Sequence, residues 1–191
     1  MNFKYLLLIL LVINGFLFSQ IKYPKDEVQV NYVEHIRTVF YDAIEDDDIN
    51  DKFLDYIKDA IKKSGGKEYA FFTAYYGASE TLVAKHSYNP YTKLKYLNIG
   101  LKKISSAIKK FPESLELRFL RFSILHYIPS FLGYSSERNE DLGVIYKLLL
   151  EKDYSEVAQS IQQGIINFLI ESDRLKDTEL KRLEVLMVAK K

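Results

Sequence analysis

Three charged residues stand in apolar stretches of the sequence and are the first candidates for chemistry. Glu80 is the only charged residue in 69–84, and Arg118 and Arg121 lie three positions apart, so on a helix they share one face. An unpaired charge in an apolar interior costs several kcal/mol, so both guanidinium groups need partners. We expect Glu80 to be the partner across helices, with Glu116 as the local alternative. The group is then either an ion pair that fixes helix register or a pocket in which the arginines bind an anion or a carboxylate.

The three histidines offer a second kind of chemistry. His35 follows Glu34, but no second histidine lies four residues away, so the helical zinc motif is absent. His86 is expected at a helix end, where positive charge is favourable next to the helix dipole. His126 is expected late in another helix. If His86, His126 and Glu80 converge, the cluster suits acid–base chemistry or metal binding; otherwise both histidines are structural.

Motifs that bind metals, phosphates or cofactors are not complete in the sequence. Asp46 and Asp48 resemble the start of a calcium loop, but its sixth position is Asp51 where glycine is required, and its twelfth is Ile57 where glutamate is required. No phosphate-binding glycine loop, dinucleotide fingerprint or Gly-x-Ser-x-Gly occurs. The chain has no cysteine, which excludes a disulfide, a thiol nucleophile and a cysteine-based zinc site. We expect no metal and no cofactor.

Aromatic residues are the fourth feature. The chain has 15 tyrosines and 12 phenylalanines but no tryptophan. Tyr76 and Tyr134 belong to a group of tyrosines around the centre of the sequence and are candidate binding residues. Tyrosine suits interfaces and apolar-ligand pockets because it packs and still forms hydrogen bonds, but it also fills cores. A ligand cavity would be lined by Phe71, Phe72, Tyr75, Tyr76, Phe119 and Phe122.

A basic face is predicted on the helix that contains Lys95, Lys102 and Lys109, because these lysines recur every seven residues. Such a face suits peripheral contact with anionic lipid or an acidic partner. It is also the ordinary solvated face of a helix whose other side is apolar.

The elements that must position these residues are helices. Apolar residues recur at helical spacing through the chain, and no segment has the alternation of a strand bounded by turns. The sequence predicts an all-α fold of seven or eight antiparallel helices in a single domain, residues 20–191. The expected helices span about 28–44, 51–63, 67–86, 90–110, 113–128, 138–150, 154–171 and 177–189.

Residues 1–19 predict a signal peptide. One cation, Lys4, precedes a short apolar run, which is the layout of a secretory leader and too short to cross a bilayer. Ser19 is small enough to precede a cleavage site. We expect export, to the periplasm or outside the cell, with the mature chain beginning at Gln20. The alternative for residues 1–19 is an uncleaved N-terminal anchor or a buried first helix.

The overall composition excludes several classes of protein. The chain has 191 residues, 48% of them hydrophobic, and a formal net charge of +1. These values exclude a disordered chain and a collagen-like chain. Near-zero charge and expected export both argue against a nucleic-acid partner.

The centre of the sequence, residues 69–128, resembles a tetratricopeptide repeat. It is laid out as helix, break, helix, proline and helix, and Ala107 stands five residues before Pro112, as in the second helix of that repeat. The tryptophan and Leu-Gly signature of the family does not occur. The segments 85–100 and 116–134 are also similar to small exported bacterial helical proteins with no assigned activity. The repeat resemblance implies a protein-binding or scaffolding role.

Three functional hypotheses follow from these observations. The first is an exported helical interaction module without catalytic activity that binds another envelope protein. The second is a periplasmic binder of an apolar or amphiphilic small molecule, with an arginine for the polar head. The third is an acid–base enzyme that uses Glu80 and a histidine.

Overall fold

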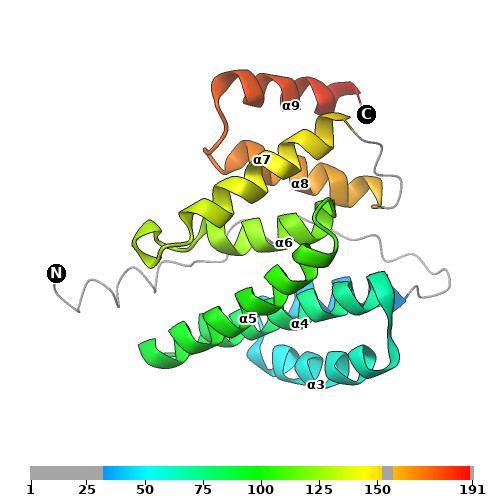
Figure 1. Cartoon of the computed structure of the whole chain (residues 1–191), viewed down its shortest axis with the longest axis vertical. Coiled ribbons are helices and arrows are strands. Elements are labelled where there is room, and N and C mark those ends of the chain that lie inside the picture. Colours follow the sequence, from blue (N-terminus) through cyan, green and yellow to red (C-terminus); the bar gives the residue numbers. More distant parts are fainter. Residues whose placement is uncertain (1–31, 152–156, 190–191) are drawn as a thin grey trace.

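The computed structural model describes residues 32–151 and 157–189 (Figure 1). Within these ranges the chain forms eight α-helices and one short 3-10 helix, and no described residue belongs to a strand. The all-α prediction is therefore confirmed. The helices are α2 (Tyr32–Ala43), α3 (Asp47–Lys63), α4 (Gly66–His86), α5 (Pro90–Lys110), α6 (Leu115–His126), η2 (Ser130–Leu132), α7 (Ser135–Glu151), α8 (Gln159–Glu171) and α9 (Asp177–Ala189).

Three sequence predictions fall wholly or partly outside the described residues. The signal peptide at 1–19 lies outside them, as do residues 28–31 and 154–156, which were expected at the starts of two helices.

Side-chain caps explain where several helices begin. Asp46 accepts a hydrogen bond from the backbone of Ile49, so α3 starts at Asp47 and the acidic segment is its first turn. The sequence analysis placed this helix start at residue 51 and was wrong by one turn, because acidic side chains favour a helix N-terminus. Asn89 caps α5 in the same way, with Pro90 in its first turn as expected.

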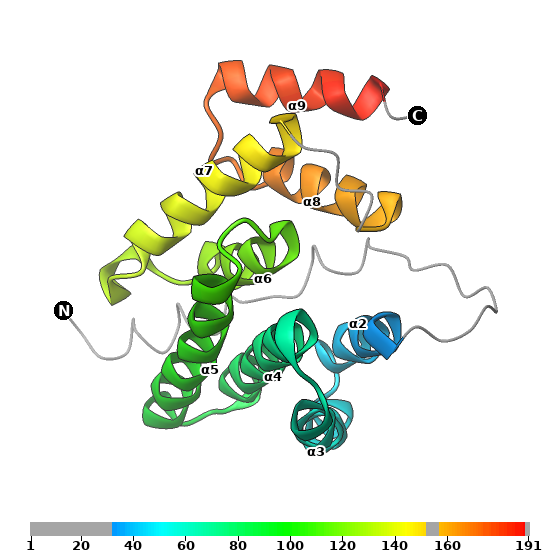
Figure 2. The same cartoon turned by 45° about the vertical axis from the view of Figure 1, so that its right-hand side comes forward.

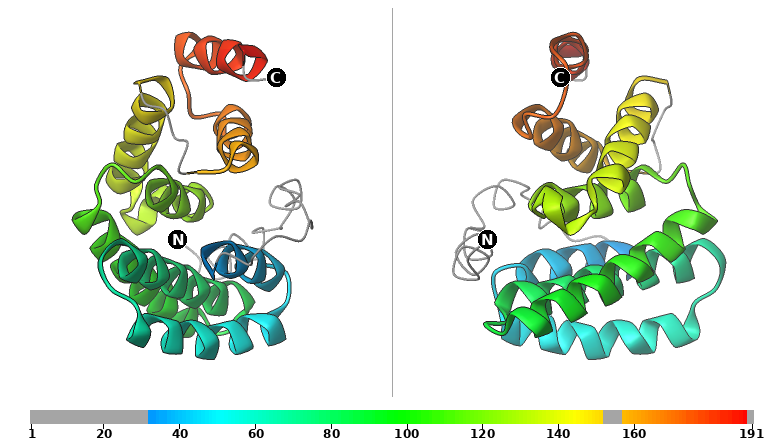
Figure 3. Two further views of the ribbon diagram at one scale, coloured as in Figure 1. Left: turned by 90° about the vertical axis from the view of Figure 1, so that its right-hand side faces the viewer. Right: turned by 60° about the vertical axis from the view of Figure 1, so that its left-hand side comes forward.

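The helices form two rows. α2, α4 and α6 contact one another in sequence and form an inner row, while α3, α5 and α7 each contact the inner-row helices next to them. Figures 2 and 3 show the same alternation, with α3, α5, α7 and α9 towards the outside of a curved arrangement. This layout is compatible with a helical repeat.

Helix α6 is the centre of the core. Leu117 and Leu120 pack into the cluster formed with α2 to α5, whereas Phe119 and Phe122 pack into the cluster formed with α7 to α9. Leu125 joins a third cluster with the end of α4 and the first half of α5. Burial on several sides explains why this helix is apolar almost all round.

The closest helix contact is between α4 and α5. A Cβ atom on Gly77 would lie 2.6 Å from the carbonyl oxygen of Gly100, and one on Gly100 would lie 2.3 Å from that of Gly77. Only glycine permits this approach, because any side chain would overlap the facing backbone. The close contact between α4 and α5 therefore depends on these two glycines.

None of the described helices is long and apolar enough to cross a membrane.

Candidate functional site

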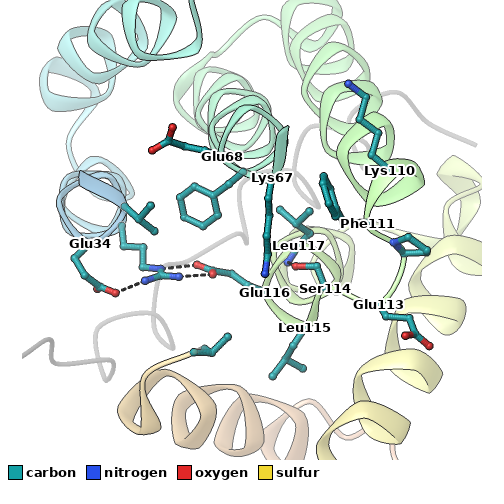
Figure 4. Close-up of a pocket in the computed structure, with 15 residues that line it drawn as sticks. Glu34, Lys67, Glu68, Lys110, Phe111, Glu113, Ser114, Leu115, Glu116 and Leu117 are labelled. Atoms are coloured by element: carbon teal, nitrogen blue, oxygen red, sulfur yellow. Dashed lines mark hydrogen bonds and ion pairs between the residues drawn. The ribbon is translucent and has the colours of Figure 1, made fainter. Parts of the chain in front are cut away.

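An open groove of about 790 Å³ lies on the inner row, between α2, the start of α4 and the start of α6 (Figure 4). The turn between α5 and α6 and Val157, which precedes α8, also line the groove. Apolar and charged side chains share the lining. The apolar lining residues are Val33, Phe71, Phe111, Pro112, Leu115, Leu117 and Val157, and the charged ones are Glu34, Arg37, Lys67, Glu68, Lys110, Glu113 and Glu116.

A buried ion pair forms one wall of the groove. Arg37 of α2 donates from Nε and Nη2 to the two carboxylate oxygens of Glu116 on α6, at 2.7 and 2.5 Å. Glu34 also accepts from this guanidinium, and the hydroxyl of Tyr75 donates to Glu116 at 2.8 Å. Burial acts to lower the pKa of Arg37, but hydrogen bonding and charge attraction from Glu116 outweigh it, so the pKa is raised. Arg37 therefore stays charged and is shared between the carboxylates of Glu116 and Glu34.

Arg118 and Arg121 have partners that the sequence analysis did not predict. Their common partner is Asp141 of α7, which accepts from Arg118 at 2.9 Å and from Arg121 at 2.6 and 2.8 Å. Glu140 accepts from Arg118 at 2.7 Å, and this contact is the main reason that the pKa of Glu140 is lowered. The expected pairing with Glu80 is wrong, because both arginines lie on the face of α6 that packs against α7.

Glu80 instead contacts α5. Its carboxylate lies 2.5 Å from the Nζ atom of Lys103, and this ammonium group also stands 4.8 Å from the centre of the Tyr76 ring. Burial, followed by the negative charge of Glu80, raises the pKa of Tyr76. Tyr76 and Glu80 are thus parts of a polar contact between α4 and α5.

The two candidate histidines have different surroundings. His126 accepts a hydrogen bond at Nδ1 from Nε of Arg174, at 2.9 Å, and its pKa is lowered to about 4 by burial and then by the charges of Arg174 and Arg138. The buried Nε2 atom of His86 has no hydrogen-bond partner among the described residues. Neither histidine shares a hydrogen bond or ion pair with Glu80 in the part of the chain that the structure describes. The contact required by the acid–base hypothesis is absent there.

Two of the candidate residues do share a pocket. Arg121 and Tyr134 line a hollow of about 210 Å³ together with Lys102, Ser105 and Asn98. Ser105 accepts from Arg121 at 3.0 Å, and the hydroxyl of Tyr134 donates to Asn98. Three N–H donors of Arg121 are therefore bonded to protein groups, and its charge is paired with that of Asp141.

The six aromatic residues expected around one cavity are divided between two cores. Phe72 packs with α2 to α5, whereas Phe119 and Phe122 contact Phe168 of α8. Phe71 is the one that lines the groove.

Several polar residues of these networks were not singled out from the sequence. One signal was present for α7: Arg138, Asp141, Ile145 and Leu148 recur at helical spacing, and all four are buried. A charge on an apolar face therefore marked Asp141 as a partner for buried cations. No equivalent signal marked Arg37, because it lies beside Glu34 on a helix with several polar positions.

No group of three or more metal-ligating side chains gathers among the described residues. No protein-family model matches the chain, and no curated protein or solved structure matches it.

Proposed function

We propose that the chain is an exported, non-catalytic interaction module of the tetratricopeptide-repeat type, which binds a segment of another envelope protein in the inner-row groove. The observation that supports this most directly is the open groove of about 790 Å³ along helices that alternate between an inner and an outer row. Helical repeats present binding surfaces on such a concave row.

The groove chemistry favours a segment that carries apolar side chains. The apolar lining residues that keep exposed surface are Val33, Phe111 and Pro112. Each large apolar side chain of a partner that is buried against them contributes about 1.5–3 kcal/mol. The Arg37–Glu116 pair beside them is mutually neutralised, so it does not select a charged ligand. The charged residues around the opening have both signs, which suits polar residues on either side of an apolar anchor.

The proposed partner is an envelope protein because we expect this chain to be exported. The proposal places the protein in the periplasm or outside the cell after removal of residues 1–19, on the basis of their cationic start and short apolar run. Intact-mass analysis of the protein purified from its own cells tests this point. A mature chain that begins at Gln20 supports export, and an intact Met1 contradicts it.

Site-specific crosslinking tests the groove itself. A photoreactive residue at Val33, in the groove, is compared with one at Val185 of α9, whose side chain is 69% exposed and does not line the groove. We expect a single partner to crosslink at the first position but not at the second. The crosslinked segment of that partner, made as a peptide, should bind the purified protein.

A pair of matched substitutions then distinguishes binding in the groove from non-specific binding. Val33→Asp places a charge in the groove and should lower peptide affinity at least tenfold, whereas Val185→Asp should leave it unchanged. Circular dichroism of both variants confirms that they fold. Equal affinities for the two variants would refute the groove as the binding site.

An amphiphilic small molecule is the second candidate for the same groove. Its volume of about 790 Å³ lies within the range of about 300–1,000 Å³ typical of small-molecule sites. Native mass spectrometry of the protein isolated under mild conditions distinguishes the two candidates. A bound lipid-sized mass that is lost with Val33→Asp would favour this ligand over a protein segment.

A further inference from the structure

Positive charge is concentrated in one continuous part of the chain. Residues 81–112 contain seven lysines and neither aspartate nor glutamate, although the whole chain has 27 basic and 26 acidic residues. This stretch covers the end of α4, the following turn and all of α5. These 32 consecutive residues contain no acidic residue, whereas the surface of a near-neutral protein usually carries both charge signs interspersed.

Three lysines of this stretch lie on one exposed face of α5. Tyr91, Lys95, Lys102 and Lys109 are separated by four, seven and seven residues, so they share a side of the helix, and all four are exposed. We call these four residues the α5 stripe. It extends over about 27 Å, at about 1.5 Å per residue.

Some exposed lysines on other helices are paired, unlike those of the α5 stripe. Lys58, Lys62 and Lys147 each lie within 4 Å of a carboxylate. The three lysines of the α5 stripe form no ion pair with any residue that the structure describes. Glu137 shares the small pocket with Lys102, yet no ion pair joins them. The three ammonium groups are thus available to an external anion.

Exposed apolar residues lie at the N-terminal end of the α5 stripe. Tyr88 is 91% exposed, Tyr91 is 79% exposed and Leu94 is 43% exposed. Tyrosine is enriched where proteins meet the membrane–water interface, because its ring enters the headgroup region while its hydroxyl stays hydrated. A straight row of lysines that ends in exposed tyrosines fits a flat anionic surface better than it fits a small acidic ligand.

We propose that the α5 stripe, with Tyr88 and Leu94, docks the protein on the surface of an anionic lipid bilayer. Helix α5 lies parallel to the membrane, the lysines contact lipid phosphates and the tyrosines enter the headgroup layer. α5 is on the outer side of the curved arrangement, away from its open side (Figure 3), so docking leaves the groove accessible. The proposal is independent of the ligand of the groove.

Vesicle flotation tests the charge contribution. The purified full-length protein is mixed with vesicles of phosphatidylcholine, with or without phosphatidylglycerol. We expect binding that requires phosphatidylglycerol and weakens in high salt. Because each lysine near an anionic membrane contributes about fivefold, the triple variant Lys95→Gln, Lys102→Gln and Lys109→Gln should bind about a hundredfold more weakly.

A second triple variant controls for net charge. Replacement of the paired lysines by Lys58→Gln, Lys62→Gln and Lys147→Gln removes the same charge from other faces and should leave vesicle binding almost unchanged. Equal losses in the two triple variants would overturn the proposal. Binding to an acidic polypeptide but not to vesicles, lost only in the first triple variant, would also overturn it and assign the α5 stripe to an acidic protein.

A fluorescent reporter tests orientation. The chain has no tryptophan, so Tyr88→Trp introduces a single probe at the expected membrane contact, and Tyr56→Trp introduces one on α3 as a control. Anionic vesicles should shift the emission of the first probe to shorter wavelength and expose it to quenching by brominated lipid. A probe at position 88 that stays as hydrated as the control on the vesicle surface would overturn the proposed orientation.

Discussion

Replacement of Asp141 by asparagine should be among the most destabilising single changes of a polar residue in this protein. The Asp141 side chain is fully buried and is the shared acceptor for two guanidinium groups. Asparagine has the same shape but no negative charge, and its amide nitrogen would face N–H donors. Breaking a buried ion pair by removing one partner costs about 3–5 kcal/mol. Glu140 remains and neutralises one arginine, so we expect the lower end of this range, about 3 kcal/mol.

Urea denaturation followed by circular dichroism measures this loss. A chain of this size loses about 2–4 °C of melting temperature per kcal/mol, so Asp141→Asn should also lower the melting temperature by about 6–12 °C. The matched control is Glu140→Gln, one residue away and paired with the same arginine. The Glu140 side chain is 56% exposed, and exposed pairs contribute about 0–1 kcal/mol, so its loss should be small.

The two variants give a clear test because they differ in burial rather than in chemistry. Similar and small shifts in the urea midpoint for both would refute the reasoning that a buried charge network holds α6 to α7. A large shift for Glu140→Gln alone would place the dominant contact at the surface instead.

Three other predictions follow from the same contacts. Gly100→Ala forces α4 and α5 apart and should lower the free energy of unfolding, measured in urea, by about 3 kcal/mol. The control Gly143→Ala meets open space and should raise it by up to about 1 kcal/mol. An unchanged stability in Gly100→Ala would contradict the close approach of the two helices. Because the pKa of His126 falls from 6.5 to about 4 on folding, its contribution to stability is complete above pH 6.5 and is lost as the pH falls towards 4. Because His126 is partly exposed to solvent, the expected loss of stability is about 2 kcal/mol. Urea midpoints measured across that pH range should show this loss in the native protein but not in His126→Asn. The same pH profile in both proteins would contradict a contribution from His126. Arg121→Ala should lower the urea midpoint far more than Lys102→Ala, and equal shifts would contradict a buried guanidinium.

The helices were predictable because their apolar periodicity and end signals agree. α5 shows this best: Asn89 and Pro90 mark its start, Phe111 follows its end, and Leu97, Leu101, Ile104 and Ile108 lie on its buried face. Helix α3 shows the limit, since acidic residues suit either a loop or a first helical turn, and only the Asp46 cap decides between them.

The partners of the buried charges were not predictable to the same degree. The sequence shows that Arg118 and Arg121 need carboxylates, but several acidic residues satisfy that need equally well. The carboxylate that pairs with each arginine depends on the rotation of α6 about its own axis. In the structure its arginines face α7 and its Glu116 faces α2. Spacing along one helix cannot give the orientation of its neighbour.

Three polar contacts that join distant parts of the chain meet at α6, and one of them bears on the groove. Glu116 at its start binds Arg37 of α2, Arg121 at its middle binds Asp141 of α7, and the end of α6 accepts from Arg174 through His126. Apolar faces alone tolerate several registers, whereas each of these contacts fits only one arrangement of the helices that it joins. Since Arg37 and Glu116 also line the groove, the interaction that fixes α2 against α6 is the one that sets the distance between its walls. The shape of the groove is therefore tied to one of the polar contacts that join the helices.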